Sequence, residues 1–141
     1  MNCSIIYYSA RKTSFCEKAL KKSFPELGLN LCEAVFATKK EALGDALIKA
    51  FEKTDAVFTV GGLEFGDNRN VRDILSQAAA GSNPALCRRL KNEGGDDGYL
   101  IRAGKQLLVM LPDEPEQIEQ IMRGALAGYI KTAETNHIDV R

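Results

Sequence analysis

Short apolar runs alternate with amphipathic stretches along the first sixty residues of this chain. The runs "SIIYYS" (4–9), "LCEAVFAT" (31–38) and "DAVFTV" (55–60) are rich in β-branched and aromatic residues, which predicts three strands. The segments between them, 14–24 and 39–54, repeat apolar side chains three or four positions apart, which predicts two amphipathic helices. The third run is apolar nearly throughout, as expected of a central strand buried on both faces.

The first helix has recognisable start and stop signals. Ser14 is placed to cap its N-terminus, and Pro25 and Gly28 close it. We place Phe15 on its apolar face. The other members of that face are Cys16, Ala19, Leu20, Ser23 and Phe24.

The pattern is less regular after residue 60. A helix is predicted over 70–80, directly after a glycine-containing loop. Residues 81–98 are rich in Gly, Asn and Asp, which predicts a surface excursion with a short helical turn at "PALCRRL" (84–90). The segment "YLIRAGKQLLVML" (99–111) reads as two strands joined by a turn at Gly104.

The last helix has the clearest amphipathic pattern of the chain. Pro112 ends the preceding strand, and apolar residues then recur from Ile118 to Ile130 at helical spacing. Residues 132–141 form a polar tail that we expect to fray. The chain length and the absence of a linker predict a single domain over 1–131.

The alternation of strands and helices predicts the fold class. It favours an α/β sandwich with a mostly parallel sheet. The C-terminal hairpin adds an antiparallel strand, which makes the sheet mixed.

Composition excludes several partners and compartments. The chain has 19 basic and 19 acidic residues, so it carries no global charge that would attract nucleic acid or a membrane surface. The four cysteines have no CxxC spacing, which argues against a zinc site. The apolar runs are too short for a membrane span, and the N-terminus has no basic region ahead of its apolar stretch. We therefore expect a cytoplasmic protein with reduced thiols.

Three loops are candidates for ligand binding, because ligands of open α/β sheets bind beyond the carboxyl ends of the strands. They are "SARKTS" after the first strand, "GGLEFGDNRN" after the third and "PDEPEQ" after the last.

The glycine loop carries the strongest candidate residues. Gly61 and Gly62 lack a Cβ, so their backbone N–H groups can approach an anion and φ can be positive. Asp67 and Asp73 are candidates for catalysis or for hydroxyl contacts, and Asp67 is also the candidate ligand for Mg²⁺. The alternative is a tight turn, with Asp67, Asn68 or Asp73 stabilising the start of the following helix.

The other two loops also have structural alternatives. Ser9, Thr13 and the neighbouring cations suit a phosphate group at a helix N-terminus, but a capped turn with solvated charges explains them equally. In the last loop Pro112 and Pro115 fix the backbone, and Glu114 and Glu116 suit the first turn of the next helix, so helix initiation also explains this loop. A flavodoxin-like phosphate loop is a further alternative for residues 9–14, although its glycine and asparagine are missing.

Taken in this order, the three loops resemble those of the molybdopterin-binding domain of MoaB, Mog, the gephyrin G domain and the N-terminal part of CinA. The central motif stands here as "DAVFTVGGLEFGDNRNVRDIL", and Leu63 is closer to the CinA variant. A later stretch, "NEGGDDGYLIRAGKQLLVMLPDEPEQIEQIM", is similar to the hairpin and LPG loop of CinA-like chains.

The resemblance implies a three-layer α/β/α sandwich, a ligand and a set of site residues. The ligand would be a phosphorylated pterin (molybdopterin) or an adenine nucleotide, and the protein would be a homo-oligomer, either a trimer or a dimer. The glycine loop would hold phosphate and the LPG-like loop would close the pocket. The ligand-binding residues would be Gly61, Gly62, Gly66, Asn68, Ser9, Thr13, Pro112 and Asp113.

Two departures from the family motif leave the function open. Glu64 and Phe65 replace a glycine and a threonine, and Asp113 replaces the LPG glycine. A carboxylate beside a phosphate weakens binding unless Mg²⁺ or a cation such as Arg11, Lys12 or Lys39 compensates. The primary expectation is a molybdopterin-binding protein linked to molybdenum cofactor biosynthesis. The alternatives are a CinA-like magnesium-dependent nucleotide pyrophosphatase and an inactive scaffold. We also expect Gly62→Arg to abolish binding and leave the fold intact.

Overall fold

The computed structural model describes residues 1–63, 70–71, 86–93 and 95–131. In the first half of the chain the elements are β1 (Asn2–Tyr8), α1 (Thr13–Ser23), the 3-10 helix η1 (Pro25–Leu27), β2 (Asn30–Ala37), α2 (Lys40–Lys53) and β3 (Ala56–Val60). In the second half they are β4 (Leu86–Leu90), β5 (Gly98–Ala103), β6 (Gln106–Leu111), α4 (Pro115–Ile121) and the π-helical turn η2 (Met122–Leu126).

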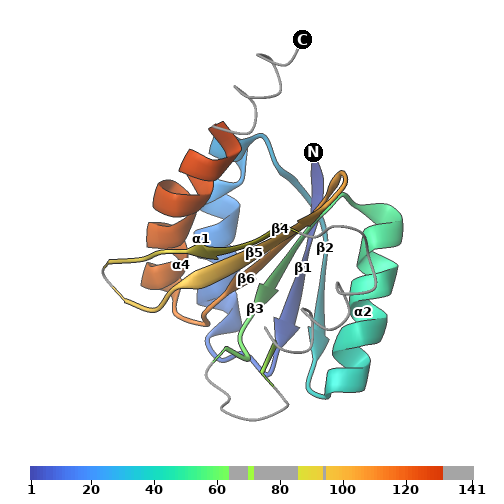
Figure 1. Cartoon of the computed structure of the whole chain (residues 1–141). Coiled ribbons are helices and arrows are strands. Elements are labelled where there is room, and N and C mark those ends of the chain that lie inside the picture. The colour runs from blue at the N-terminus through green and yellow to red at the C-terminus, as the bar shows by residue number, and fades with distance from the viewer. Residues whose placement is uncertain (64–69, 72–85, 94, 132–141) are drawn as a thin grey trace.

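The strands form one six-stranded mixed sheet in the order β2-β1-β3-β6-β5-β4 (Figure 1). β1 pairs in parallel with β2 and β3, and β3 pairs in parallel with β6. β5 is antiparallel to both β6 and β4. The carboxyl ends of β1, β3 and β6 and the start of β5 therefore lie at one edge of the sheet.

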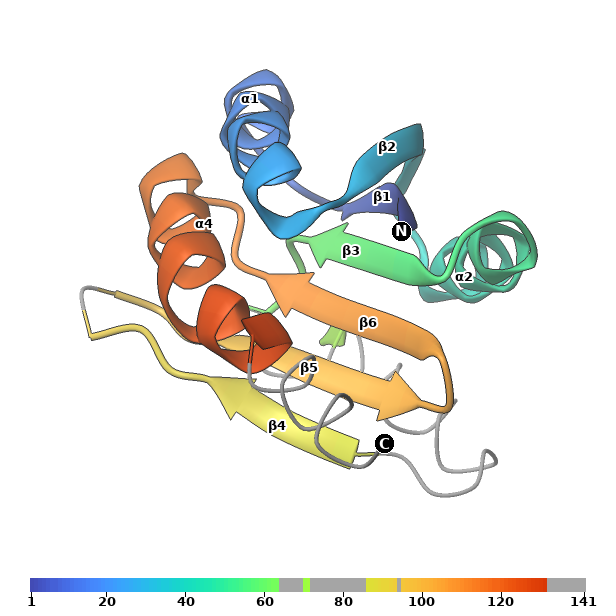
Figure 2. The ribbon, with the colours of Figure 1, turned by 90° about the horizontal axis from the view of Figure 1, so that it is seen from above.

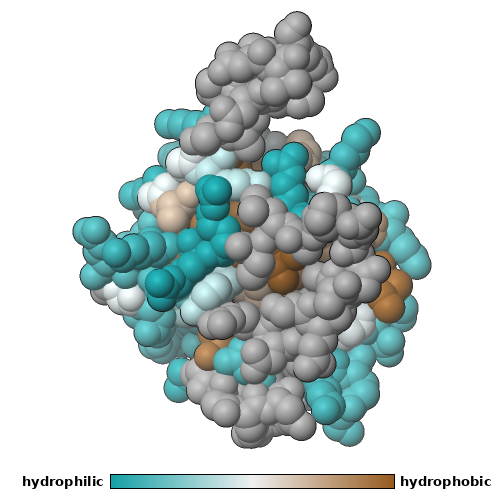
Figure 3. Space-filling model, viewed as in Figure 1, coloured by the Kyte–Doolittle hydropathy of each residue, from teal (hydrophilic) through white to brown (hydrophobic). Residues whose placement is uncertain are grey.

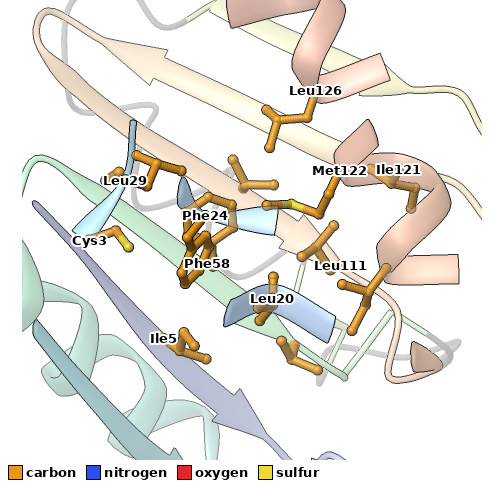
Figure 4. Packing of buried hydrophobic residues seen from close by; sticks show 14 of the residues in the cluster. Cys3, Ile5, Leu20, Phe24, Leu29, Phe58, Leu111, Ile121, Met122 and Leu126 are labelled. Carbon is orange, nitrogen blue, oxygen red and sulfur yellow. The ribbon is translucent and has the colours of Figure 1, made fainter. Parts of the chain in front are cut away.

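Helices cover both faces of the sheet, which confirms the predicted three-layer α/β/α fold. α1 and α4 lie side by side on one face and α2 lies on the other (Figure 2). Under α1 and α4, Phe24 packs on Phe58 with ring centroids 5.1 Å apart, and Leu20, Leu111 and Met122 surround them (Figure 4). Burying five such side chains contributes on the order of 10 kcal/mol relative to exposing them.

The second core lies between the sheet and α2. Ile6, Tyr8, Val57 and Met110 point to this face from β1, β3 and β6, and Leu43 of α2 packs against them. The alternation of β1 between the two cores follows from the two-residue period of a strand. It also explains why this strand and β3 read as continuously apolar in the sequence.

Most of the predicted elements are confirmed. The hairpin turns at Gly104, whose φ is +61°, and Ala103 pairs with Gln106 across it. Gly28 closes the α1 region in a left-handed conformation, with φ of +70°. The last helix continues from α4 through η2 to residue 131.

Three local expectations are wrong. Residues 86–90 form β4 instead of a helical turn, because Leu86 to Leu90 pair with Arg102 to Gly98 of β5. Ser14 does not cap α1: the N-cap is Lys12 in a left-handed conformation, and no side chain caps the helix. Phe15 is 65% exposed, and the buried stripe of α1 begins at Cys16.

The surface agrees with the balanced charge of the chain. In the view of Figure 3 the described surface is mainly hydrophilic, with small separate apolar patches. Among the described helices, none has the length and apolar content that crossing a membrane requires. The described cysteines Cys3, Cys16 and Cys32 are free thiols, as expected.

Candidate functional site

A cleft of about 540 Å³ lies at the edge where β1, β3 and β6 end. Its walls come from the three predicted loops and from the connection between β4 and β5. The described lining residues are Arg11, Leu63, Gly95, Asp96, Asp97, Tyr99, Pro112, Asp113 and Glu114. The volume lies within the range of small-molecule sites in proteins.

Two ion pairs join the loop after β1 to the loop after β6, and we call them the carboxylate latch. Asp113 Oδ2 accepts the backbone N–H of Arg11 at 2.9 Å and its Nε–H at 3.2 Å. Lys12 Nζ donates to Glu114 Oε2 at 3.1 Å. Asp113 is 4% exposed, so its carboxylate holds the Arg11 N–H where water has little access. Of the cations expected to compensate the acids of the site, Arg11 contacts Asp113, whereas Lys12 pairs with Glu114. Glu64 lies outside the described residues, so its compensation stays a prediction.

Gly61 and Gly62, which we call the glycine ledge, lie between the end of β3 and the lining residue Leu63 and are not among the described residues that line the cleft. Their φ values are +95° and +84°, as the sequence suggested. A Cβ on Gly61 would lie 2.5 Å from the carbonyl oxygen of Tyr8, and one on Gly62 would overlap the Tyr8 ring. The expectation that Gly62→Arg leaves the fold intact is therefore wrong, because the space beside the ledge is filled by β1.

Hydrogen bonds tie the ledge to β6 on one side and connect it and Leu63 to residues 70–71 on the other. Gly61 N–H donates to Leu111 O at 3.0 Å, and Gly62 O accepts the N–H of Val71 at 3.1 Å. Asn70 Nδ2 donates to Leu63 O at 3.0 Å. The Gly61 donor is thus committed to β6, and the ledge presents Leu63 to the cleft.

Ser9 and Thr13 flank the cleft without lining its described walls. Ser9 has a left-handed φ of +49°, and its N–H donates to Ala37 O at 2.9 Å. Its hydroxyl donates to Thr38 O at 3.4 Å, which connects β1 to the loop after β2. Thr13 is the first residue of α1 and is half-buried. Pro112 and Asp113 do line the cleft.

The cleft is acidic on the side of the β4–β5 connection. Asp97 Oδ1 accepts the backbone N–H of Asn92 at 2.8 Å, and its Oδ2 lies 3.6 Å from Arg89 Nη1. Asp96 is exposed beside it. Arg11 is the single cation among the described lining residues. The described walls thus offer several carboxylates, one guanidinium and the apolar surface of Leu63, Tyr99 and Pro112.

Cys16 lies beneath the latch. Its thiol is buried and points at the carbonyl oxygen of Arg11, 3.9 Å away. Burial, and after it the nearby carboxylates of Asp113 and Glu114, raise the pKa of Cys16 from 9.0 to about 11. The thiol is therefore neutral at physiological pH and is not an activated nucleophile.

The remaining predicted site residues lie outside the described part of the chain. They are Gly66, Asp67, Asn68 and Asp73, together with the substituted positions Glu64 and Phe65. Their proposed roles, including Mg²⁺ binding by Asp67, remain predictions. Within the described ranges, no three His, Cys, Asp or Glu side chains converge as a metal site would require.

Tyr99, Asp96 and Asp97 were missed as site residues. The sequence placed residues 81–98 on the surface and assigned Tyr99 only to a strand. Because β5 is antiparallel to β6, its second residue, Tyr99, pairs with Met110 near the edge where β6 ends. The direction of the predicted hairpin was the available signal. It places the start of the first hairpin strand, and with it the segment "DDGY", beside the end of the second strand and so at the cleft.

No protein-family model and no curated protein sequence matches this chain. Solved structures do match in fold. The protein CinA from Thermoplasma acidophilum has a TM-score of 0.70 and 18% identity, covering 92% of this chain and 97% of that chain. The molybdopterin biosynthesis Mog protein from Mycobacterium ulcerans has a TM-score of 0.69 and 22% identity, covering 94% and 95%. The tungsten cofactor synthesizing protein MoaB from Pyrococcus furiosus has a TM-score of 0.61 and 14% identity, covering 97% and 93%.

These likenesses confirm the resemblance at the level of the fold. The chain adopts the three-layer fold of the MoaB, Mog and CinA proteins from its first strand to its last helix. The agreement spans nearly the whole length of both partners in each comparison, so the likeness is not confined to one part of the fold.

Proposed function

We propose that this chain is a molybdopterin-binding protein, which takes a phosphorylated pterin in the cleft at the carboxyl ends of β1, β3 and β6. The observation that carries the proposal is the position of that cleft on a fold shared with proteins described as molybdopterin biosynthesis proteins. Ligands of such sheets bind at this edge. The cleft also has the mixed apolar and polar walls of a small-molecule site.

The walls suit the two faces and the edge of a pterin. Leu63, Tyr99 and Pro112 supply apolar surface for a flat ring. A pterin carries an amino group and a ring N–H on one edge, and carboxylates are strong acceptors for such donors. Asp96 and Asp97 stand on the same side of the cleft as Tyr99, so they are the acceptors we assign to that edge.

The phosphate group is assigned to the side of Arg11. The Arg11 guanidinium is the one cation among the described lining residues and its side chain is 73% exposed, so it can face a bound phosphate. The nearby carboxylates repel an anion such as phosphate. We therefore propose that Mg²⁺ binds together with the phosphate and that Asp67 is a ligand of this Mg²⁺. An adenine nucleotide is the second ligand that this chemistry accommodates. The cytoplasmic location expected from the sequence remains a prediction.

The test is isothermal titration with molybdopterin or its precursor, ATP, ADP-ribose and FMN, each with and without Mg²⁺. We expect binding of the pterin, weakened about tenfold by Tyr99→Leu because ring stacking is lost. Phe36→Leu is the matched control, since Phe36 is an exposed aromatic residue of β2 at the far edge of the sheet. We also expect Arg11→Ala to weaken a phosphorylated ligand and leave the dephosphorylated ligand unaffected.

Three outcomes would overturn the proposal. The first is that none of these ligands binds the folded protein. The second is that the pterin binds but neither Tyr99→Leu nor Arg11→Ala changes its affinity. The third is binding of FMN in preference to the pterin, which would support a flavodoxin-like site.

A further inference from the structure

Two arginines of neighbouring strands meet at one tyrosine of the last helix. Arg88 of β4 lies with its Cζ 5.2 Å from the centroid of the Tyr129 ring. Arg102 of β5 donates from Nη1 to the hydroxyl oxygen of the same tyrosine at 3.2 Å. We call these three side chains the arginine–tyrosine cluster.

The strand register explains why the two arginines come together. Arg88 lies opposite Leu100 of β5, and Arg102 is two residues further along that strand. The arginines are therefore diagonal neighbours on one face of the sheet. Leu100 on this face is buried in the core under α4, and Tyr129 packs against the same core. The backbone thus holds both guanidinium groups beside one ring.

The cluster lies away from the cleft. Arg102 pairs with Leu107 near the start of β6, whereas the cleft lies where β6 ends. α4 begins beside the cleft at Pro115, and the helix that continues from it runs back along the sheet (Figure 1). Its last turns bring Tyr129 towards the opposite end. A ligand of this cluster would be separate from the pterin, so the inference does not rest on the proposed function.

The charges of the cluster are not neutralised by the acids that the structure describes. Arg11, Arg89 and Arg123 each lie within 3.6 Å of a carboxylate oxygen. Arg88 and Arg102, by contrast, form no ion pair with any residue in the described ranges. Two positive charges held near each other repel, and a bound anion would relieve that repulsion.

The cluster also has hydrogen-bond donors that face no described acceptor. Both arginines are exposed, and no hydrogen bond within the described residues uses the N–H groups of Arg88. Arg102 uses Nε for the carbonyl oxygen of Gly104 at 3.3 Å and Nη1 for Tyr129, which leaves the N–H groups of Nη2. Because the Tyr129 hydroxyl accepts from Arg102, its own O–H can be donated to a ligand.

We propose that the arginine–tyrosine cluster is a second binding site, which takes the phosphate group of a small molecule. Guanidinium groups match the geometry of phosphate oxygens, and charge-assisted hydrogen bonds of this kind are strong. Two guanidinium groups and one hydroxyl can each reach a separate oxygen of one tetrahedral group. A carboxylate has only two oxygens, so it would use the cluster less fully.

A purely structural role for the arginines makes a different prediction. Cations near the C-terminal end of a helix stabilise it, and a cation beside an aromatic ring helps to hold that ring in place. In that role the arginines would stabilise the fold to the same extent with and without phosphate. Binding of phosphate at the cluster would instead make their contribution grow with phosphate concentration.

The test is an NMR titration of the full chain that follows the arginine Nε–H signals. Inorganic phosphate and glycerol phosphate are added separately from about 0.1 to about 20 mM at constant ionic strength. We expect the signals of Arg88 and Arg102 to shift along one saturating curve, with half-saturation at about 1 mM. Tighter binding of glycerol phosphate would support a phosphorylated metabolite as the ligand, and tighter binding of inorganic phosphate would support the free ion. The same shifts should occur in Arg11→Ala, which separates this site from phosphate binding in the cleft.

Arg89 provides a closely matched control for Arg88. It is the next residue of β4, it faces the other side of the sheet, and it already has Asp97 as a partner at 3.6 Å. We expect Arg88→Gln or Arg102→Gln to weaken phosphate binding at least about tenfold and Arg89→Gln to leave it unchanged. Phosphate should likewise raise the melting temperature of the wild type and of Arg89→Gln, but not that of Arg88→Gln. Shifts that do not saturate, or equal effects of Arg88→Gln and Arg89→Gln, would overturn the proposal.

Discussion

The glycine ledge and the carboxylate latch hold the same cleft in different ways. The ledge (Gly61 and Gly62) is backbone packed against Tyr8, with no side chains of its own. The latch (Arg11–Asp113 and Lys12–Glu114) is made of charged groups that reach across from separate loops. Gly61 and Gly62 therefore have no room for a side chain, whereas the charged groups of the latch can form ion pairs with other groups. The ledge fixes the backbone that precedes the lining residue Leu63, whereas Arg11, Asp113 and Glu114 of the latch line the cleft themselves. The charged lining can therefore change while the backbone at the end of β3 stays the same.

The largest effect is expected at the ledge, for Gly62→Ala. The new Cβ would overlap the buried Tyr8 ring and lie 3.2 Å from Val71 Cβ, at a φ that disfavours side chains. Strain at positive φ and overpacking together should lower the free energy of unfolding by about 3–5 kcal/mol. Urea denaturation followed by circular dichroism measures this change.

Substitutions at two other glycines separate the effect of positive φ from the effect of steric overlap with Tyr8. Gly104 has φ of +61° and open space around its Cβ position, so Gly104→Ala should cost only about 1–2 kcal/mol. Gly44 lies in α2 with open space, so Gly44→Ala should stabilise by about 0.5–1 kcal/mol. If Gly62→Ala were no worse than Gly104→Ala, contact with Tyr8 would not be what the ledge requires.

A smaller effect is expected at the latch, for Asp113→Ala. The substitution leaves the Arg11 N–H without its buried acceptor, which should cost about 2–3 kcal/mol in urea denaturation. Arg11→Ala keeps that N–H and removes a side chain that is 73% exposed, so it should cost less than about 1 kcal/mol.

The control for the latch is Asp45→Ala, an exposed carboxylate on α2. It should change the stability by less than about 0.5 kcal/mol. Equal losses for Asp113→Ala and Arg11→Ala would mean that the ion pair, and not the backbone contact, connects the two loops. The latch would then be weaker and more sensitive to salt than we infer.

The same contrast explains what the sequence could and could not predict. The order of strands and helices follows from local periodicity, so the meeting of three loops at one edge was predictable. The ledge was predictable as a place that needs glycine, but its neighbour Tyr8 is fifty residues away in the chain. The partner of Asp113 is about a hundred residues away, and no local pattern signals it.

Two further errors have a similar cause. β4 was assigned to a helical turn because "PALCRRL" has no alternation that distinguishes a strand, and its pairing with β5 decides the outcome. Phe15 was placed in the core because its spacing fits the apolar stripe of α1. Helical periodicity indicates which side of α1 is apolar, but it does not indicate how much of that side is buried. The buried residues of α1 begin at Cys16, one residue after Phe15.

The smallest effect concerns the thiol beneath the latch and appears only at alkaline pH. Because the pKa of Cys16 is about 11 in the folded protein and 9.0 otherwise, the unfolded chain loses its proton first. The stability from this group is complete below pH 9 and is lost as the pH rises towards 11. The shift corresponds to roughly 2–3 kcal/mol in full, of which about half is lost by pH 10. Thermal denaturation of the wild type and Cys16→Ala between pH 7.5 and pH 10 should show their stability difference narrowing by that amount. A constant difference across this range would mean that Cys16 ionises as easily in the folded protein as in the unfolded chain, and that water reaches the space under Asp113.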